Sequence, residues 1–293
     1  ALFVKGSQDA GTIATAKHFP GHGDTDVDSH AGLPVVTADW ARFRQVELVP
    51  FRAAIDAGAG MVMSAHIALP ALEGDSTTPA TLAPRIMTGL LRDTLGFGGV
   101  AITDALTMDG VGKGYGVAES SILAVKAGAD ILLKPSDPTK AVEAIVAAVE
   151  RGELTRERID ASARRVLELK ARSGVAFNRF TSLDELRRIV GAPAHRERAN
   201  DIARRAVTLL RDRGTLVPLG RTRTLVIQYM PETELRAGRA FAAALRAADP
   251  TVRVVKISPS SAPSQLEALA PAIAGAERVV MAAFVRRIEG EGR

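Results

Sequence analysis

Four short apolar runs divide the first half of the chain, and they set the expected architecture. They are Thr12–Ala16, Gly60–Ala65, Gly99–Thr103 and Ala129–Leu133. Their apolar residues are continuous rather than alternating, which is typical of parallel strands that are covered on both faces. Each run is therefore predicted to be a buried strand.

Stretches with helical spacing of apolar residues lie between these runs. They span Glu47–Ala57, Pro84–Leu95, Val117–Ala127 and Thr139–Val149. Strands that alternate with helices indicate βαβ units and a parallel sheet, so the expected fold class is α/β. Four such units equal half of an eight-stranded β/α barrel.

The second half of the chain predicts a connector and another α/β unit. A helix is expected from Arg156 to about Arg172, and residues 175–212 predict a helical connector with helices at Ser182–Val190 and His195–Leu210. Three further strands then alternate with helices near residues 232–248 and 264–274; the strands are Thr224–Gln228, Arg253–Ile257 and Arg278–Phe284. Residues 213–293 are therefore expected to begin a second α/β domain, which the sequence leaves truncated.

Composition and charge narrow the function classes. Hydrophobic residues make up 46% of the chain, which supports a packed core, and the absence of cysteine excludes disulfides and thiolate metal sites. The net charge of +5 comes from Arg151–Arg213, where 16 Lys/Arg face 9 Asp/Glu in helical patterns. Such a region is typical of a solvated helix face, so we expect no nucleic-acid partner.

The longest nearly apolar stretch, Ala57–Leu72, is too short for a membrane span. The sequence leaves the cellular compartment of the protein undetermined.

Polar side chains follow the carboxyl ends of the predicted strands. In a β/α barrel the active site is built at that end of the strands. Asp104 follows the third run directly, which suggests a carboxylate nucleophile or general base, although a helix cap or a loop ion pair is the alternative. Lys17 and His18 follow the first run, where either could bind a substrate hydroxyl. The alternatives are that Lys17 merely reaches solvent from the end of the strand and that His18 is a hydrogen-bonded histidine of the core. His66 follows the second run and is a candidate for supporting the site from behind.

The stretch Lys17–His30, reading KHFPGHGDTDVDSH, is unusually rich in ionisable groups, with three of the five histidines of the chain. Asp28 and His30 are two residues apart, so in an extended segment both side chains point the same way. A neighbouring carboxylate raises the pKa of an imidazole and fixes its tautomer, which makes His30 a usable proton donor. An incidental ion pair within the loop is the alternative.

The same stretch contains metal-ligand residue types, namely His18, His22, Asp24 and His30. Pro20 disfavours the helix that would place two of these histidines on one face. We therefore expect no metal site, and the alternative of a metal-dependent hydrolase would require loss of activity on chelation.

Six segments together resemble the glycoside hydrolases of family 3, and within it the β-N-acetylglucosaminidases. They are KHFPGHGDTDVDSH followed by Leu33-Pro34, MSAHI at 63–67, PATLAP at 79–84, LGFGGVAITDALTMDGV at 95–111 and AGADILLKP at 127–135. The resemblance covers about residues 1–173 in unbroken order. It implies that residues 1–174 are the second half of a (β/α)8 catalytic barrel. Because the family has a first half-barrel before KHFPGHG, we expect the 293 residues alone to be inactive and poorly stable.

The resemblance also implies a mechanism. Asp104 matches the family's nucleophile, Asp28 and His30 match its acid/base pair, and Lys17 and His18 match residues that contact sugar hydroxyls. The implied reaction is retaining hydrolysis of a terminal β-linked N-acetylglucosamine from cell-wall-derived glycans or muropeptides, without a cofactor. Two alternatives stay open. A histidine acid is neutral after losing its proton and repels phosphate little, which permits a phosphorylase, and a non-catalytic carbohydrate-binding relative is the other.

Overall fold

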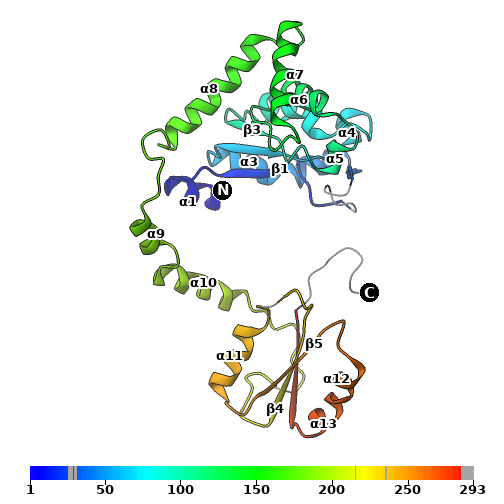
Figure 1. Ribbon diagram of the computed structural model, residues 1–293, viewed down its shortest axis with the longest axis vertical. Coiled ribbons are helices and arrows are strands. Elements are labelled where there is room, and N and C mark those ends of the chain that lie inside the picture. Colours follow the sequence, from blue (N-terminus) through cyan, green and yellow to red (C-terminus); the bar gives the residue numbers. More distant parts are fainter. Residues whose placement is uncertain (26–28, 30–31, 215, 235, 285–293) are drawn as a thin grey trace. The chain divides into compact units, whose positions relative to one another are not determined.

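The computed structural model describes residues 1–25, 29, 32–214, 216–234 and 236–284. The chain folds into two compact units, Ala1–Val190 and Gly191–Arg293, and the boundary falls within the predicted connector. Figure 1 shows the order of the helices and strands in each unit. None of the described helices is both long enough and apolar enough to cross a membrane.

The first unit is built on a parallel sheet of three strands in the order β1–β2–β3, with helices before, between and after them. The strands are β1 (Thr15–Phe19), β2 (Met61–Ser64) and β3 (Val100–Ile102). The helices are α1 (Leu2–Asp9), α2 (Trp40–Gln45), α3 (Leu48–Asp56), α4 (Pro70–Glu73), η1 (Ala80–Leu82), η2 (Arg85–Thr94), α5 (Asp109–Gly112), α6 (Val117–Ala127), α7 (Pro138–Glu150), α8 (Arg156–Arg172) and α9 (Leu183–Ile189). The predicted α/β class with a parallel sheet is confirmed for this unit.

The core of this unit lies between the sheet and the helices that cover it. Phe19 on β1, Val62 on β2 and Ala101 on β3 are fully buried, together with Ile86 and Leu91 from η2. The helix η2 is wound more widely than an α-helix, and the N–H of Leu95 bonds to the carbonyl of Leu90 five residues back. Its apolar positions nevertheless face the core, as the pattern over Pro84–Leu95 predicts.

The first predicted strand, Thr12–Ala16, was placed three residues too early. β1 runs over Thr15–Phe19 and includes Lys17 and His18, which were expected just beyond the strand. β1 is at the edge of the three-stranded sheet, and Thr15 and Lys17 are exposed. An edge strand needs no continuous apolar run, which is why the apolar residues alone misplace it.

The fourth predicted strand, Ala129–Leu133, is reduced to one bridge between Ile102 and Ile131. The regular ladder stops because the N–H of Leu133 donates to the Thr103 hydroxyl at 2.9 Å rather than to a backbone carbonyl. Backbone hydrogen bonds still join this segment to β3, including Thr103 N–H to Ile131 C=O at 3.1 Å. The segment therefore lies beside β3, in the position that a fourth strand would take.

The second unit holds another parallel sheet of three strands, in the order β5–β4–β6. Its elements are α10 (Pro193–Ala206), β4 (Thr224–Tyr229), α11 (Arg239–Ala248), β5 (Arg253–Ile257), α12 (Pro263–Glu267), α13 (Leu269–Ala274) and β6 (Arg278–Ala283). Helix α11 and the pair α12–α13 lie on opposite sides of the sheet (Figure 1). The three strand predictions are confirmed to within one residue. The helix expected near 232–248 begins only at Arg239, after Gly238 turns the chain with a φ of 70°.

Candidate active site

The carboxyl ends of β1, β2 and β3 bring three sequence-predicted residues to one edge of the sheet. His18 is on β1, His66 follows β2, and Asp104 follows β3 by two residues. β1 and β3 both pair with β2, so His18 and Asp104 approach each other across the end of the middle strand.

Asp104 and His18 are in contact. Asp104 Oδ2 lies 3.5 Å from His18 Nε2, and the two side chains are 17% and 30% exposed respectively. The other carboxylate oxygen, Oδ1, accepts a hydrogen bond from the N–H of Ala105 at 2.8 Å. One oxygen of Asp104 is thus fixed by its own backbone, and the other faces an imidazole and partial access to solvent. A carboxylate in this setting can act as a nucleophile.

His66 supports the segment that carries Asp104. It is fully buried, and its Nε2 lies 3.0 Å from the carbonyl oxygen of Ala105. Because a carbonyl oxygen only accepts, Nε2 must carry the proton in this contact. The peptide groups on either side of Ala105 are therefore held twice, at the N–H by Asp104 and at the C=O by His66.

Thr81 anchors His66 from the other side and was not predicted from the sequence. Its hydroxyl oxygen is fully buried and lies 2.9 Å from His66 Nδ1, 2.8 Å from Ser64 Oγ and 3.0 Å from the Ala65 carbonyl oxygen. Thr81 lies in the segment PATLAP, where no pattern distinguishes it from a structural threonine. Only the fold reveals that η1 brings this hydroxyl under the end of β2.

Lys17 and His18 also line a cavity of about 410 Å³ between β1, the start of the loop that follows it, and the helices α2 and α3. Gly21, His22, Arg42 and Glu47 contribute to its wall, whereas Asp104 is not among the described residues that line it. Lys17 is exposed, and among the described residues it makes no ion pair within 4.0 Å with Asp104.

The start of the loop after β1 is tied to the helices α2 and α3. Arg42 Nη1 lies 2.7 Å from Asp24 Oδ2, and Arg42 Nη2 lies 3.1 Å from Glu47 Oε1. His22 Nδ1 lies 3.1 Å from the Thr25 hydroxyl. Within the part of the chain that the structure describes, no group of three or more His, Asp or Glu side chains could hold a metal ion.

Asp28 and His30, the predicted acid/base pair, lie outside the described residues. Their neighbours Ser29 and Gly32 are described. Ser29 is 4% exposed, and its carbonyl oxygen accepts from the N–H of Gly110 at 3.3 Å. A Cβ on Gly110 would meet His66 Cβ at 2.9 Å and the Gly32 carbonyl oxygen at 3.1 Å. Ser29 and Gly32 therefore lie against the segment that follows Asp104 and against His66.

Comparison with known proteins gives consistent matches. The model of the glycosyl hydrolase family 3 N-terminal domain matches residues 1–169. Beta-hexosaminidase A of Pseudoalteromonas piscicida is 36% identical over 250 residues, which cover 79% of this chain and 41% of that protein.

Solved structures extend the likeness to both units. The family 3 beta-N-acetylglucosaminidase from Paenibacillus sp. str. FPU-7 is 35% identical with a TM-score of 0.81, over 96% of this chain and 55% of that one. A beta-glucoside phosphorylase bound to 2FGlc is 25% identical, also with a TM-score of 0.81, over 95% of this chain and 52% of that one. The chain thus spans about half the length of these relatives.

Proposed function

The chain belongs to glycoside hydrolase family 3, and from this premise we propose that it takes part in removing terminal β-linked N-acetylglucosamine from glycans by a retaining mechanism. The observation that carries the proposal is the partly exposed pair of Asp104 and His18 at the carboxyl edge of the sheet. The names of the hexosaminidase relatives support the substrate class. Fragments derived from bacterial cell walls are the proposed source of the glycan.

In the first step Asp104 attacks the anomeric carbon while His30, oriented by Asp28, gives its proton to the leaving oxygen. The bond from C1 to the leaving group breaks, and a bond from C1 to the Asp104 carboxylate forms. In the second step water attacks C1, His30 takes a proton from it, and the bond to Asp104 breaks. His18 and Lys17 are proposed to hold the sugar hydroxyls. The burial of Ser29 against Gly110 supports the role given to its two neighbours.

We also propose that the sheet of the first unit is the second half of a (β/α)8 barrel. The order of the strands in the sheet, β1–β2–β3, is their order along the chain. The parallel bridge between Ile102 and Ile131 places the next segment of the chain beside β3, which continues the same order. Successive parallel neighbours joined by helices are what a barrel requires. Asp104 and His18 then lie at the carboxyl ends of the strands, the end at which barrel enzymes carry their active sites.

The proposed nucleophile can be tested with 4-nitrophenyl β-N-acetylglucosaminide in a version of the protein that carries an intact eight-stranded barrel, because the 293 residues alone are expected to be inactive. Asp104→Ala should lower turnover at least a thousandfold, because no covalent intermediate can form. Asp109→Ala is a matched control, since Asp109 belongs to the same segment but pairs with Lys113 at the surface, and it should turn over normally. Equal turnover, above the background of the assay, by Asp104→Ala and the unaltered protein would refute the role of Asp104.

A phosphorylase is the second candidate, favoured by the likeness to the beta-glucoside phosphorylase and by a histidine in place of a carboxylic acid. The same assay with and without inorganic phosphate separates the two reactions. A hydrolase releases free N-acetylglucosamine at a rate independent of phosphate, whereas a phosphorylase releases the sugar 1-phosphate.

A further inference from the structure

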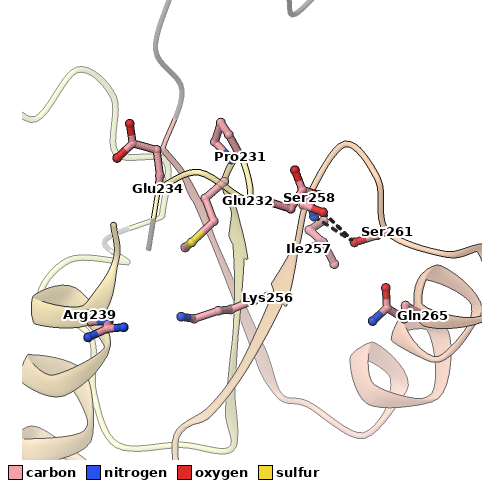
Figure 2. Close-up of a pocket in the computed structure, with 10 residues that line it drawn as sticks. Pro231, Glu232, Glu234, Arg239, Lys256, Ile257, Ser258, Ser261 and Gln265 are labelled. Atoms are coloured by element: carbon pink, nitrogen blue, oxygen red, sulfur yellow. Dashed lines mark hydrogen bonds between the residues drawn. The ribbon is translucent and has the colours of Figure 1, made fainter. Parts of the chain in front are cut away.

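A second cavity lies in the other unit, at the carboxyl ends of β4 and β5 (Figure 2). Its volume is about 350 Å³, which is within the range of small-molecule sites. In open α/β sheets, ligands bind in crevices outside the carboxyl ends of the strands. The wall combines the segment after β4, the first residue of α11, the end of β5 and the helix α12.

Two cations line this cavity. Arg239 begins α11 and Lys256 is on β5, and in Figure 2 their charged ends extend toward each other. Among the described residues, no carboxylate oxygen lies within 4.0 Å of either side-chain nitrogen group. The Glu234 carboxylate, also in the wall, points away from both in Figure 2. Two like charges gathered in one concavity without a carboxylate partner favour an anion between them.

Glu232, one of the two glutamates in the wall, already accepts hydrogen bonds from neighbouring serines. Hydrogen bonds from the Ser258 and Ser260 hydroxyls lower the pKa of Glu232 to about 2, so its carboxylate is charged and supplied with donors at neutral pH. The contact with Ser260 joins the segment after β4 to the segment after β5. Glu232 therefore holds the two segments together, and among the described residues its carboxylate makes no ion pair within 4.0 Å with Lys256 or Arg239.

The remaining polar groups present donors to the cavity. Ser261 Oγ accepts from the N–H of Ser258 at 2.9 Å and lies 3.5 Å from Ser258 Oγ, so its own proton can donate either to that hydroxyl or to a bound molecule. Gln265 Oε1 accepts from the N–H of Ala262 at 3.1 Å, so its amide NH₂ remains available too. Met230 and Ile257 add an apolar wall. A site with four kinds of donor and an apolar side suits an acceptor-rich molecule with an anionic group.

We propose that this cavity binds a small anionic sugar, one that carries a phosphate or a carboxylate group on a body the size of a monosaccharide. Arg239 and Lys256 bind the anionic group, because a guanidinium and an ammonium together match its charge and its acceptors. Ser261 and Gln265 donate to the hydroxyl oxygens, and Met230 and Ile257 pack against the carbon skeleton. The lining residues all belong to the second unit, and the proposal does not rest on the role proposed for Asp104.

Isothermal titration calorimetry on the 293-residue chain tests the proposal with glucose 6-phosphate, glucuronate and glucose as probes. We expect at least one of the two anions to bind with a Kd below about 1 mM, and neutral glucose to bind at least tenfold more weakly. The anion that binds identifies phosphate or carboxylate as the group recognised. Lys256→Gln and Arg239→Gln, each made separately at an exposed position, should each weaken that binding at least tenfold.

Two control variants locate the site. Arg246→Gln changes a cation in the last turn of α11, away from the cavity lining, and should leave the Kd unchanged. Asp104→Asn should also leave it unchanged, which separates this site from the proposed active site. The proposal is overturned if neither anion binds below about 1 mM, if both cation variants bind as tightly as the unaltered chain, or if Asp104→Asn abolishes binding.

Discussion

At the scale of single residues, the buried contact between His66 and the Ala105 carbonyl is the least expected feature of the candidate site. Among the described residues, Asp104 contacts its own backbone at Ala105 and the His18 imidazole at 3.5 Å, so its position depends on where the peptide chain at Ala105 lies. His66 holds the Ala105 carbonyl by a hydrogen bond, and the Thr81 hydroxyl holds the other nitrogen of the His66 ring. We therefore interpret His66 as a positioning residue, which does not touch the substrate.

This interpretation predicts a difference between two variants of His66. His66→Leu removes the donor to Ala105 and should lower kcat for the aryl glycoside about ten- to a hundredfold with little change in KM, because small misplacements of a reacting group are costly. His66→Gln keeps an amide donor at a similar reach and should recover much of the loss. Full turnover by His66→Leu, or an equal loss in both folded variants, would argue against a role through this hydrogen bond.

At the scale of elements, the sheet depends on close approach of β2 and β3 at their amino ends. The N–H of Val100 bonds to the Gly60 carbonyl at 3.1 Å. A Cβ on Gly99 would lie 2.6 Å from that carbonyl oxygen and 2.7 Å from the Phe97 ring. The carbonyl is backbone and already engaged in the sheet, so neither neighbour can move without disturbing β3.

Gly99→Ala should therefore destabilise the first unit by about 1–3 kcal/mol, as expected for overpacking at a site that cannot relax. Gly98→Ala is the matched control, because a Cβ there meets nothing within 4 Å. Chemical denaturation followed by circular dichroism measures both variants. Equal unfolding midpoints for the two would show that β3 can shift to accommodate the methyl group.

Two of the elements that the sequence misplaces, both in the first unit, have local causes. β1 contains Lys17 and His18 because an edge strand can expose alternate side chains, which breaks the apolar run used to find it. The segment from Ala129 to Leu133 looks like a strand, yet the Thr103 side chain replaces one ladder acceptor. The pattern of apolar residues indicates which segments are buried, but it does not indicate which acceptor a given backbone N–H will bond to.

At the scale of the whole chain, the α/β class, both parallel sheets and the boundaries of α6 and α8 follow from hydrophobic patterning and helix-ending signals. The contact between His18 and Asp104 could not be predicted in this way, because it depends on the pairing of β1 and β3 with the same middle strand. The cavity beside Lys256 depends on loops after β4 and β5, whose residues carry no recognised motif. Patterning therefore predicts elements, and the sites appear only when their ends are brought together.

The buried carboxylate of Asp130 links three elements of the first unit that are distant in sequence, on the side of the sheet away from the candidate active site. The Asp130 side chain is fully buried, and its Oδ2 accepts from Arg92 at 2.6 Å and from the N–H of Ala101 at 3.0 Å. Its Oδ1 accepts from Ser162 at 2.7 Å and from Arg165 at 3.0 Å, both on α8. Helix η2, strand β3 and helix α8 therefore converge on a single side chain. Burial lowers the pKa of Arg92, which Asp130 opposes by favouring the charged guanidinium.

Asp130→Ala should cost about 3–5 kcal/mol of unfolding free energy, because it leaves a largely buried guanidinium without its partner. Asp9→Ala removes the exposed ion pair with Lys5 and should cost less than about 1 kcal/mol. Hydrogen exchange can locate the loss, since amides of η2, β3 and α8 should lose protection together while those of β4 and β5 in the other unit keep theirs. Loss confined to α8 would instead mean that Asp130 merely attaches that helix. Loss across all three elements would show that the edge of the sheet opposite the candidate active site stabilises the unit on which the site is built.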